Sequence, residues 1–420
     1  MRLRQHSEIA IISGAFLFGF ALFFKTELAN VALILFYAAV VFNYFVSKSG
    51  LPKLDRKIVF GTTLMLLISI LISIVHLKDA EPILNTLGRR ITYLLSPIMF
   101  LLIPNKQLKV LTKYAFKGLI IGGVLSSIFL ILNILNEYYF TRPFLSIDKD
   151  ILNFYHTNFY FTRIVDIHPS YYGMYLITAL AYIYFSDGVK YKILNVIFSI
   201  IIIVSIIFLN SRIILFLFFV LHLISLVSFF QKRINSIFKT LMASTIVFVL
   251  LLGVLFVTTK STYAFQRIVK ETLWELTYKV DDNYNSSGKG DSRLARWHAA
   301  LNLIIKKPLL GYGVLSESNE LLYEYKRLGM KSAAENEYNA HNQYLGFTLE
   351  GGIFSFLALL CFLFFNLYIS LKSRDLLFFF FVISVSSICF IENYLIRNAG
   401  VVFVAFFSSM FLFNYVKNDS

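Results

Sequence analysis

The stretch from Lys192 to Lys232 reads KILNVIFSIIIIVSIIFLNSRIILFLFFVLHLISLVSFFQK. It holds two apolar runs, near 193–209 and 213–230, which are separated only by the polar turn Asn210-Ser211-Arg212. Each run approaches the roughly 20 residues that a helix needs to cross a bilayer. Because a helix satisfies its own backbone hydrogen bonds in hydrocarbon, this stretch predicts two antiparallel transmembrane helices joined by a very short turn.

The same pattern continues along the 420-residue chain, which is 58% hydrophobic and only 15% charged. Soluble domains carry about 25% charged residues, so the composition excludes a soluble globule and a disordered chain. A membrane barrel would show short alternating strands instead. The predicted fold class is an all-α polytopic membrane protein with about twelve transmembrane helices. Ten further spans are expected near 9–24, 28–46, 58–76, 91–104, 114–136, 168–185, 240–258, 343–370, 376–391 and 399–415.

The basic residues indicate the orientation of these spans. The chain has 39 Lys and Arg and a formal charge of +15, and the short loops on one side hold a large set of basic residues. They are Lys48, Lys53, Arg56, Lys57, Lys106, Lys109, Lys113, Lys190, Lys192, Lys232, Arg233, Lys239, Lys372 and Arg374. Cytoplasmic loops are enriched in Lys and Arg, so this side and both termini are predicted to be cytoplasmic. We interpret the N-terminal apolar run as an uncleaved first span, since no cleavage-site pattern follows it.

One long polar insertion interrupts the spans on the opposite side. The predicted organisation is a transmembrane region of about nine helices over 1–258, a mainly helical external loop domain over 259–342, and a region of about three helices over 343–420. About 80 residues are too many for an idle connector. A helix is expected between a cap at Asp291 or Ser292 and a stop at Pro308, and a second one ending just before Gly329. The expected apolar stripes are Leu294, Trp297, Leu301, Ile304 and Ile305 on the first helix, and Leu321, Leu322, Tyr325 and Leu328 on the second.

Three motifs stand in order in the insertion and in the span after it. They are Arg293-Leu-Ala-Arg296-Trp297, Pro308-Leu-Leu-Gly311-Tyr-Gly313, and His341-Asn342-Gln-Tyr344-Leu345 followed by Glu350-Gly-Gly352. In order and spacing they resemble the O-antigen ligase and polymerase superfamily. The arginine in Asn210-Ser211-Arg212 at an external span end also resembles that family, and His168-Pro169-Ser170-Tyr171 is a weaker match.

The resemblance implies a metal-independent, inverting glycosyltransferase of the bacterial inner membrane, with no cofactor. Such an enzyme takes a glycan from undecaprenyl diphosphate and passes it to a hydroxyl on the periplasmic face. Three acceptors stay open: the lipid A core (a ligase), the growing glycan (a polymerase) and a protein Ser or Thr (an oligosaccharyltransferase). The ligase is favoured because the chain is compact and has one large late loop. Membrane lipids are further expected partners. No nucleic-acid partner is expected.

A transporter of polysaccharide or lipid-linked sugar is the alternative from another class, because a twelve-span topology supports it equally. The asymmetric insertion argues against it. So does the placing of polar residues at the external ends of spans, instead of near the middle of the membrane.

Arginine suits the diphosphate of the carrier, since its planar guanidinium stays charged and bonds in a bidentate manner. Arg212, Arg293 and Arg296 are the candidates, with Arg293 placed ahead of Arg296 by the expected apolar stripe. The alternatives without a binding role are that Arg212 is a snorkelling residue at a span end and that Arg293 and Arg296 lie on a solvated helix face.

His341 is the candidate general base for the acceptor hydroxyl, because imidazole titrates near neutral pH. The alternative is a structural histidine. Asn342, Tyr344 and Glu350 give it a specific context, and Glu350 is expected either to pair with an arginine or to accept hydrogen bonds from a neighbouring helix. Arg90 adds positive potential in an external loop or anchors it at the interface.

No metal site is expected. Asp148, Asp150 and Asp166 share an external segment, yet they show no ordered ligand pattern, and solvated loop carboxylates explain them better. Cys361 and Cys389 lie inside apolar runs, so neither a disulfide framework nor a zinc site is indicated.

Overall fold

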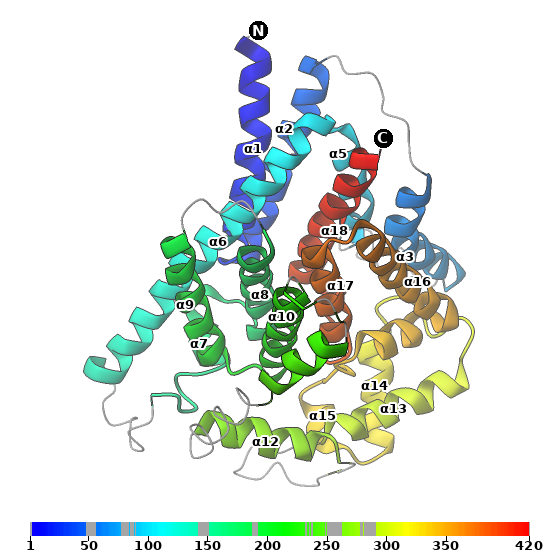
Figure 1. Cartoon of the computed structure of the whole chain (residues 1–420). Coiled ribbons are helices and arrows are strands. Elements are labelled where there is room, and N and C mark those ends of the chain that lie inside the picture. Colours follow the sequence, from blue (N-terminus) through cyan, green and yellow to red (C-terminus); the bar gives the residue numbers. More distant parts are fainter. Residues whose placement is uncertain are drawn as a thin grey trace. The chain divides into compact units, whose positions relative to one another are not determined.

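The computed structural model describes residues 2–47, 56–76, 84, 88, 90–141, 151–186, 192–231, 233–234, 236, 238–247, 249, 263–277, 280 and 291–419. Within these ranges every regular element is a helix. The chain divides into two compact units, which are described separately. The first unit comprises Met1–Gly14, Leu33–Thr112 and Thr272–Ser420, and the second comprises Ala15–Ala32 and Lys113–Glu271. Figure 1 gives the order of the helices along the chain.

Four helices have residues in both units: α1 (Arg2–Ala21), α2 (Thr26–Ser47), α6 (Asn105–Asn136) and α12 (Tyr263–Glu275). The first unit also holds α3 (Arg56–Val75), α5 (Thr92–Leu102), α13 (Arg293–Lys306), α14 (Glu317–Arg327), α15 (Lys331–Glu335), α16 (Gln343–Ser373), α17 (Leu376–Cys389) and α18 (Asn398–Asp419). The second unit holds the π-helix η1 (Glu137–Thr141), α7 (Phe159–Thr162), the 3-10 helix η3 (Arg163–Val165), α8 (Pro169–Phe185), α9 (Lys192–Leu209), α10 (Arg212–Gln231) and an unlabelled helix over Phe238–Val247.

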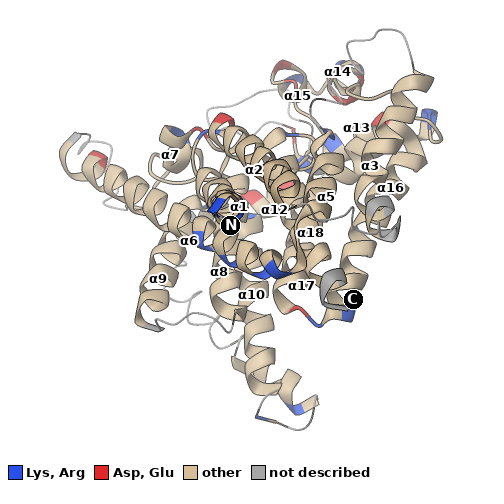
Figure 2. Ribbon diagram, turned by 90° about the horizontal axis from the view of Figure 1, so that it is seen from above, with Lys and Arg blue, Asp and Glu red and all other residues tan. Residues whose placement is uncertain are grey.

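These helices confirm that the protein is an all-helical polytopic membrane protein. Five of the described helices are long and apolar enough to cross a membrane, namely Thr26–Ser47, Asn105–Phe140, Arg212–Gln231, Gln343–Ser373 and Asn398–Tyr415. Shorter apolar helices cover Gly61–Val75, Thr92–Leu102, Ile193–Leu209, Phe238–Val247 and Leu376–Cys389. Figure 2 shows long runs of ribbon without a charged residue. The end of the expected span 240–258 lies outside the described residues.

Aromatic side chains fill much of the first unit. Phe36, Phe100 and Phe406 are buried and their ring centroids lie 5.2 to 5.7 Å apart, which joins α2, α5 and α18. On the other side of α18, the Phe378 and Phe411 rings stack with centroids 4.8 Å apart. Apolar packing of this kind fixes helices whose outer faces carry exposed leucines and phenylalanines, as expected for surfaces that meet lipid.

The two helices expected in the insertion are present, and the caps are as predicted. The Ser292 hydroxyl accepts a hydrogen bond from Ala295 N (3.3 Å) at the start of α13. Gly329 takes a φ of 70° directly after α14, and Leu321 and Tyr325 on α14 are buried.

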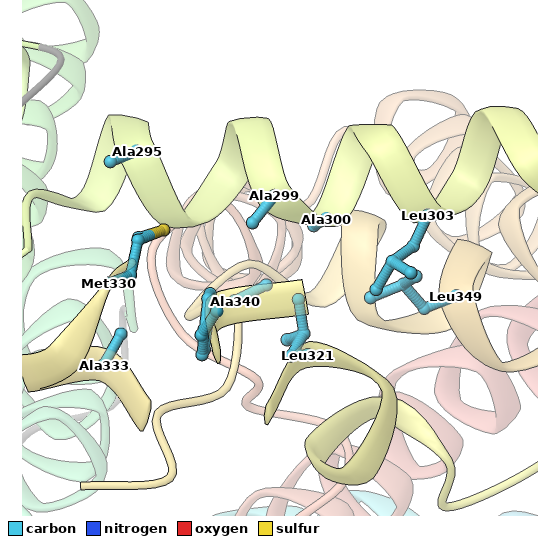
Figure 3. Packing of buried hydrophobic residues seen from close by; sticks show 10 residues of the cluster. Ala295, Ala299, Ala300, Leu303, Leu321, Met330, Ala333, Ala340 and Leu349 are labelled. Carbon is cyan, nitrogen blue, oxygen red and sulfur yellow. The ribbon is translucent and has the colours of Figure 1, made fainter. Parts of the chain in front are cut away.

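The predicted apolar stripe of α13 was wrong for Leu294, Leu301 and Ile305, whereas Ile304 does pack against the buried cluster. The buried face carries Ala295, Ala299, Ala300 and Leu303 (Figure 3), whereas Leu294, Leu301 and Ile305 are 37%, 45% and 75% exposed. Small side chains let this helix pack closely against α14 and α16, which the larger leucines of the opposite face would prevent. As a consequence, Arg296 lies on the buried face.

Candidate functional site

The site is built around a break in α16. Gly351 (φ −134°, ψ 24°) and Gly352 (φ 58°, ψ −150°) leave the helical conformation, so nearby backbone groups lose their partners within the helix. The turn after Pro308 replaces them. Tyr312 N donates to Leu349 O and Gly313 N to Glu350 O, both at 2.9 Å. In return, Ile353 N donates to Pro308 O at 2.9 Å.

This backbone docking explains the glycines in two of the sequence motifs. Gly311 and Gly352 have φ values of 63° and 58°, which a residue with a Cβ adopts only at a cost. A Cβ at Gly311 would collide with the Leu349 carbonyl, and a Cβ at Gly352 with the Leu309 carbonyl. The Pro-x-x-Gly-x-Gly turn and the Glu-Gly-Gly sequence are therefore two halves of one contact.

The break also fixes a buried ion pair. Arg90 Nη2 lies 2.6 Å from Glu350 Oε2, with side chains that are only 4% and 2% exposed. Arg90 Nη1 donates to Ser69 Oγ at 2.5 Å, and its guanidinium lies 4.7 Å from the centre of the Phe347 ring. Glu350 Oε1 accepts from Leu315 N at 3.1 Å. Of the two expectations for Glu350, the pairing with an arginine is met, whereas its hydrogen bond comes from the turn before α14 instead of from a neighbouring helix.

His341 precedes α16 directly. Asn342 caps this helix, since its Oδ1 accepts from Tyr344 N (3.0 Å) and Leu345 N (3.1 Å). His341 has a φ of 47°, a conformation that is uncommon for residues other than glycine. Strained backbone of this kind costs on the order of 1–3 kcal/mol and persists only where the surroundings impose it. The imidazole is 25% exposed, so it is open to a substrate as well as held by the protein.

The imidazole has an acidic partner that the sequence did not reveal. His341 Nδ1 lies 3.1 Å from Glu392 Oε2, in the connection between α17 and α18, and the Glu392 side chain is 16% exposed. A carboxylate on Nδ1 fixes the tautomer in which Nδ1 carries the proton and Nε2 holds the lone pair. That arrangement suits a general base, because the carboxylate also stabilises the imidazolium that forms after proton transfer.

Aromatic and amide side chains hold the backbone around His341. Trp297 Nε1 donates to Ala340 O at 3.0 Å, and Asn342 N donates to the Asn393 side chain at 3.0 Å. Tyr344 reaches α17, where its hydroxyl donates to Ser386 O at 3.1 Å. Asn342 and Tyr344 therefore support the position of His341 and of the first turn of α16.

The α13 arginines lie in the same unit as His341. Arg296 is 5% exposed, lies 3.5 Å from Glu275 Oε2 and places its guanidinium 5.0 Å from the Tyr338 ring. The Tyr338 ring in turn lies 6.0 Å from the His341 ring. Arg293 is half-buried and its backbone N–H donates to Glu275 Oε2 at 2.6 Å. The contacts thus connect Arg296 to His341 through one aromatic ring, although the expected stripe had placed Arg293 first.

Part of the chain that forms this site matches a known protein family. Residues 197–360 match the O-antigen ligase family. The match covers less than half of the chain, and it confirms the resemblance that the motifs indicated. Members of the O-antigen ligase family are membrane enzymes, ligases or polymerases, and the family implies lipid-linked glycan substrates. None of the curated proteins matches this chain.

The O-antigen ligase match includes seven of the predicted site residues: Arg212, Arg293, Arg296, His341, Asn342, Tyr344 and Glu350. Arg90 precedes it and Glu392 follows it. Glu392 has one signal in the sequence, since it is an acidic residue directly after an apolar run that ends on the external side of the predicted topology. Its distance of 51 positions from His341 hides the pairing from any local motif.

Arg212 lies in the second unit of the chain, within the O-antigen ligase match. It is the first residue of α10, it is half-buried, and Asn210 in the preceding turn has a φ of 43°. The short turn predicted here is confirmed, while the approach of Arg212 to the carrier stays a prediction. In the same unit, His168 Nδ1 accepts from Ser170 N at 3.2 Å, so this histidine caps α8. Asp166 is exposed, and Asp148 and Asp150 lie outside the described residues.

Proposed function

We propose that the protein is a membrane glycosyltransferase that moves a glycan from undecaprenyl diphosphate to an acceptor hydroxyl, and that it acts as an O-antigen ligase on the lipid A core. The observation that carries this proposal is the pairing of His341 with Glu392 at 3.1 Å, next to the domain that matches the O-antigen ligase family.

In the proposed reaction His341 Nε2 takes the proton of the acceptor hydroxyl. The hydroxyl oxygen attacks the anomeric carbon from the face opposite the carrier, so the new C–O bond forms as the bond to the diphosphate breaks and the configuration inverts. The bonding electrons leave with the diphosphate oxygen. His341, held by Glu392, keeps the proton until solvent removes it. A positioned base of this type contributes about 10² to 10⁴ in rate.

The arginines neutralise the departing diphosphate. Arg212, Arg293 and Arg296 are proposed to bind it, because guanidinium groups offer paired donors to phosphate oxygens. A lipid diphosphate is a good leaving group, so positioning and charge neutralisation suffice without a metal ion. Asn342 and Tyr344 support His341 through the contacts described above. Glu350 and Arg90 support the site by fixing the break in α16.

The proposed topology has about twelve spans, with both termini in the cytoplasm of a bacterial inner membrane and the 259–342 loop domain in the periplasm. The excess of Lys and Arg in the opposite short loops supports it. A cysteine introduced at Ser287 of an otherwise cysteine-free chain should react with an impermeant reagent added from the periplasmic side. Reaction only from the cytoplasmic side would invert the topology and remove the proposed mechanism.

Purified protein in liposomes, supplied with labelled undecaprenyl diphosphate glycan, tests the function. Lipid A core, free glycan and a protein acceptor are added in separate reactions, with His341→Ala as the inactive control. We expect label on the lipid A core. Label on the glycan would make the protein a polymerase, and label on the protein would make it an oligosaccharyltransferase. If the carrier crosses the bilayer and is never consumed, the protein is a transporter.

A further inference from the structure

Glu317, the first residue of α14, lies behind the His341–Glu392 pair and took no part in the sequence predictions. Its side chain is buried. Oε1 accepts a hydrogen bond from Ala340 N at 3.0 Å, and Oε2 accepts one from Asn393 Nδ2 at 2.6 Å. Ala340 immediately precedes His341, and Asn393 immediately follows Glu392. A single carboxylate is therefore bonded to the chain neighbours of both members of the pair.

Asn393 also forms a hydrogen bond with the residue that follows His341. Its Oδ1 accepts from Asn342 N at 3.0 Å, while its Nδ2 donates to Glu317. The residues before and after His341 are consequently held by the hydrogen-bonded side chains of Glu317 and Asn393. These bonds, together with the hydrogen bond from His341 N to Asn339 Oδ1 at 3.0 Å, surround the residue with the positive φ.

The first turn of α16 leaves room for this carboxylate. A Cβ added at Gly346 would lie 2.9 Å from Glu317 Oε2 and 3.2 Å from Asn393 Nδ2. Glycine is an unfavourable residue inside a helix relative to alanine. Its presence here is explained by the space that the Glu317–Asn393 hydrogen bond needs.

The charge of Glu317 is expensive to bury. Burial raises its pKa to about 7, against the opposing effect of the hydrogen bonds from Ala340 and Asn393. Among charged groups facing it, Glu350 raises this pKa further and Arg90 lowers it, and the Tyr325 hydroxyl of its own helix also lies in its field. Within the described residues no Lys or Arg forms an ion pair with Glu317. A buried carboxylate without a cation does not stabilise a fold well. The role of Glu317 therefore lies in the hydrogen bonds that it accepts from Ala340 and Asn393.

We propose that Glu317 is a positioning residue for the transfer reaction: its ionised carboxylate holds Ala340 and Asn393 so that the His341 imidazole stays on the Glu392 carboxylate. This inference rests on the proposed role of His341 as general base.

Protonation of Glu317 disturbs the two hydrogen bonds that it accepts from Ala340 and Asn393. The ionised carboxylate accepts from two donors, one on each oxygen. A protonated carboxyl turns a hydrogen toward one of these donors, so one of the two bonds is lost. Since the pKa of Glu317 is about 7, the holding of His341 weakens as pH falls from 8 to 6.

Glu317→Gln mimics the protonated state with little change of shape. The amide presents one acceptor and one donor, and the donor must face either Ala340 N or Asn393 Nδ2. We expect the kcat of glycan transfer at pH 8 to fall on the order of 10²-fold, as a displacement of about 1 Å does in other active sites. The KM for the carrier should stay near that of the wild type. The ratio of wild-type to variant activity should shrink toward pH 6, where the wild-type residue is itself protonated.

A second substitution should restore the hydrogen bonds. When Glu317→Gln is combined with Asn393→Asp, the introduced amide oxygen accepts from Ala340 N and the introduced amide nitrogen donates to one oxygen of the new carboxylate. The other oxygen of that carboxylate accepts from Asn342 N. We expect the double variant to recover most of the lost activity. Glu320→Gln, one turn along the same helix, is the matched control and should leave transfer unchanged.

Two results would overturn the inference: a Glu317→Gln protein that transfers at the wild-type rate at pH 8, or a double variant that is no better than the single one. The first is separable from a failure of the proposed function. If His341→Ala also transfers normally, the base is misassigned and the proposed function fails. If His341→Ala is inactive while Glu317→Gln is normal, only the positioning role of Glu317 is lost.

Discussion

The two units of the protein differ in what they bury. Among the described residues, every buried Asp, Glu, Lys or Arg belongs to the first unit: Arg90, Asp291, Arg296, Glu317, Glu324 and Glu350. The buried polar groups of the second unit are hydroxyls, amides and one imidazole, such as Tyr172, whose hydroxyl lies 2.8 Å from that of Ser126. Buried charge is destabilising unless it is paired. The first unit therefore holds the buried charged groups of the described residues, whereas the buried polar groups of the second unit are uncharged hydroxyls, amides and an imidazole.

Breaking the buried ion pair of the first unit tests this difference most strongly. Arg90→Ala leaves Glu350 buried without its cation, which costs about 3–5 kcal/mol. In the second unit Arg163, 55% exposed and 3.9 Å from Glu137, should give less than about 1 kcal/mol on the same change. Thermal unfolding in detergent compares the two variants. Equal losses of stability would erase the distinction between the units.

The second unit contributes one predicted binding residue, Arg212. Loss of a single donor to a departing oxyanion costs about 10²–10³-fold in rate, so Arg212→Ala and Arg293→Ala should each reduce glycan transfer by that order while the protein stays folded. Lysine should rescue poorly, because it replaces a planar fork by a point charge. Transfer assays at limiting carrier concentration measure this effect. Full activity of Arg212→Ala would exclude Arg212 as a residue of the second unit that binds the carrier.

Glu392→Gln removes the charge from the partner of His341 without removing its bulk. Groups that orient a functional histidine commonly contribute about 10- to 100-fold, and we expect a loss of that size in kcat. An unchanged rate would show that Glu392 does not act on His341.

The smallest expected effect concerns Glu324, a buried carboxylate of the first unit that pairs with two exposed basic side chains. Hydrogen bonds from Arg327, and then from Lys306, hold the pKa of Glu324 down at about 2. Because this pKa is below that of the unfolded chain, the stabilisation is present above about pH 4.5 and is lost as pH falls toward 2. Since Lys306 and Arg327 are more than half exposed, we expect only about 1 kcal/mol. Glu324→Gln should lower stability at pH 7 and lose that effect at pH 2.5 in denaturant titrations.

The helices of this protein could be predicted from the sequence because hydrophobic length is a local property. The cap at Ser292 and the end of α14 before Gly329 are local too, and they follow from the residue types. The break at Gly352, inside the expected continuous span 343–370, was not predicted. The buried face of α13 could not be predicted by hydrophobicity. Small residues such as Ala299 mark the contact because they let neighbouring helices approach closely, whereas the larger Ile305 stays exposed.

The candidate site was predictable only in part, for a related reason. His341, Asn342 and Glu350 stand in one continuous motif, whereas the partners that give them geometry are distant in the sequence. Glu350 pairs with Arg90 across 260 positions and His341 with Glu392 across 51. Pairings of this kind depend on how helices pack, which no local pattern encodes.

The proposed mechanism requires one reacting side chain in the first unit, His341. Single-turnover transfer from labelled carrier by His341→Ala, measured beside carrier binding, tests this role, with His298→Ala on the exposed face of α13 as the matched control. We expect binding to remain near the wild-type level, transfer to fall by about 10²–10⁴, and the His298 variant to behave as the wild type. Transfer by His341→Ala at the wild-type rate would contradict the account.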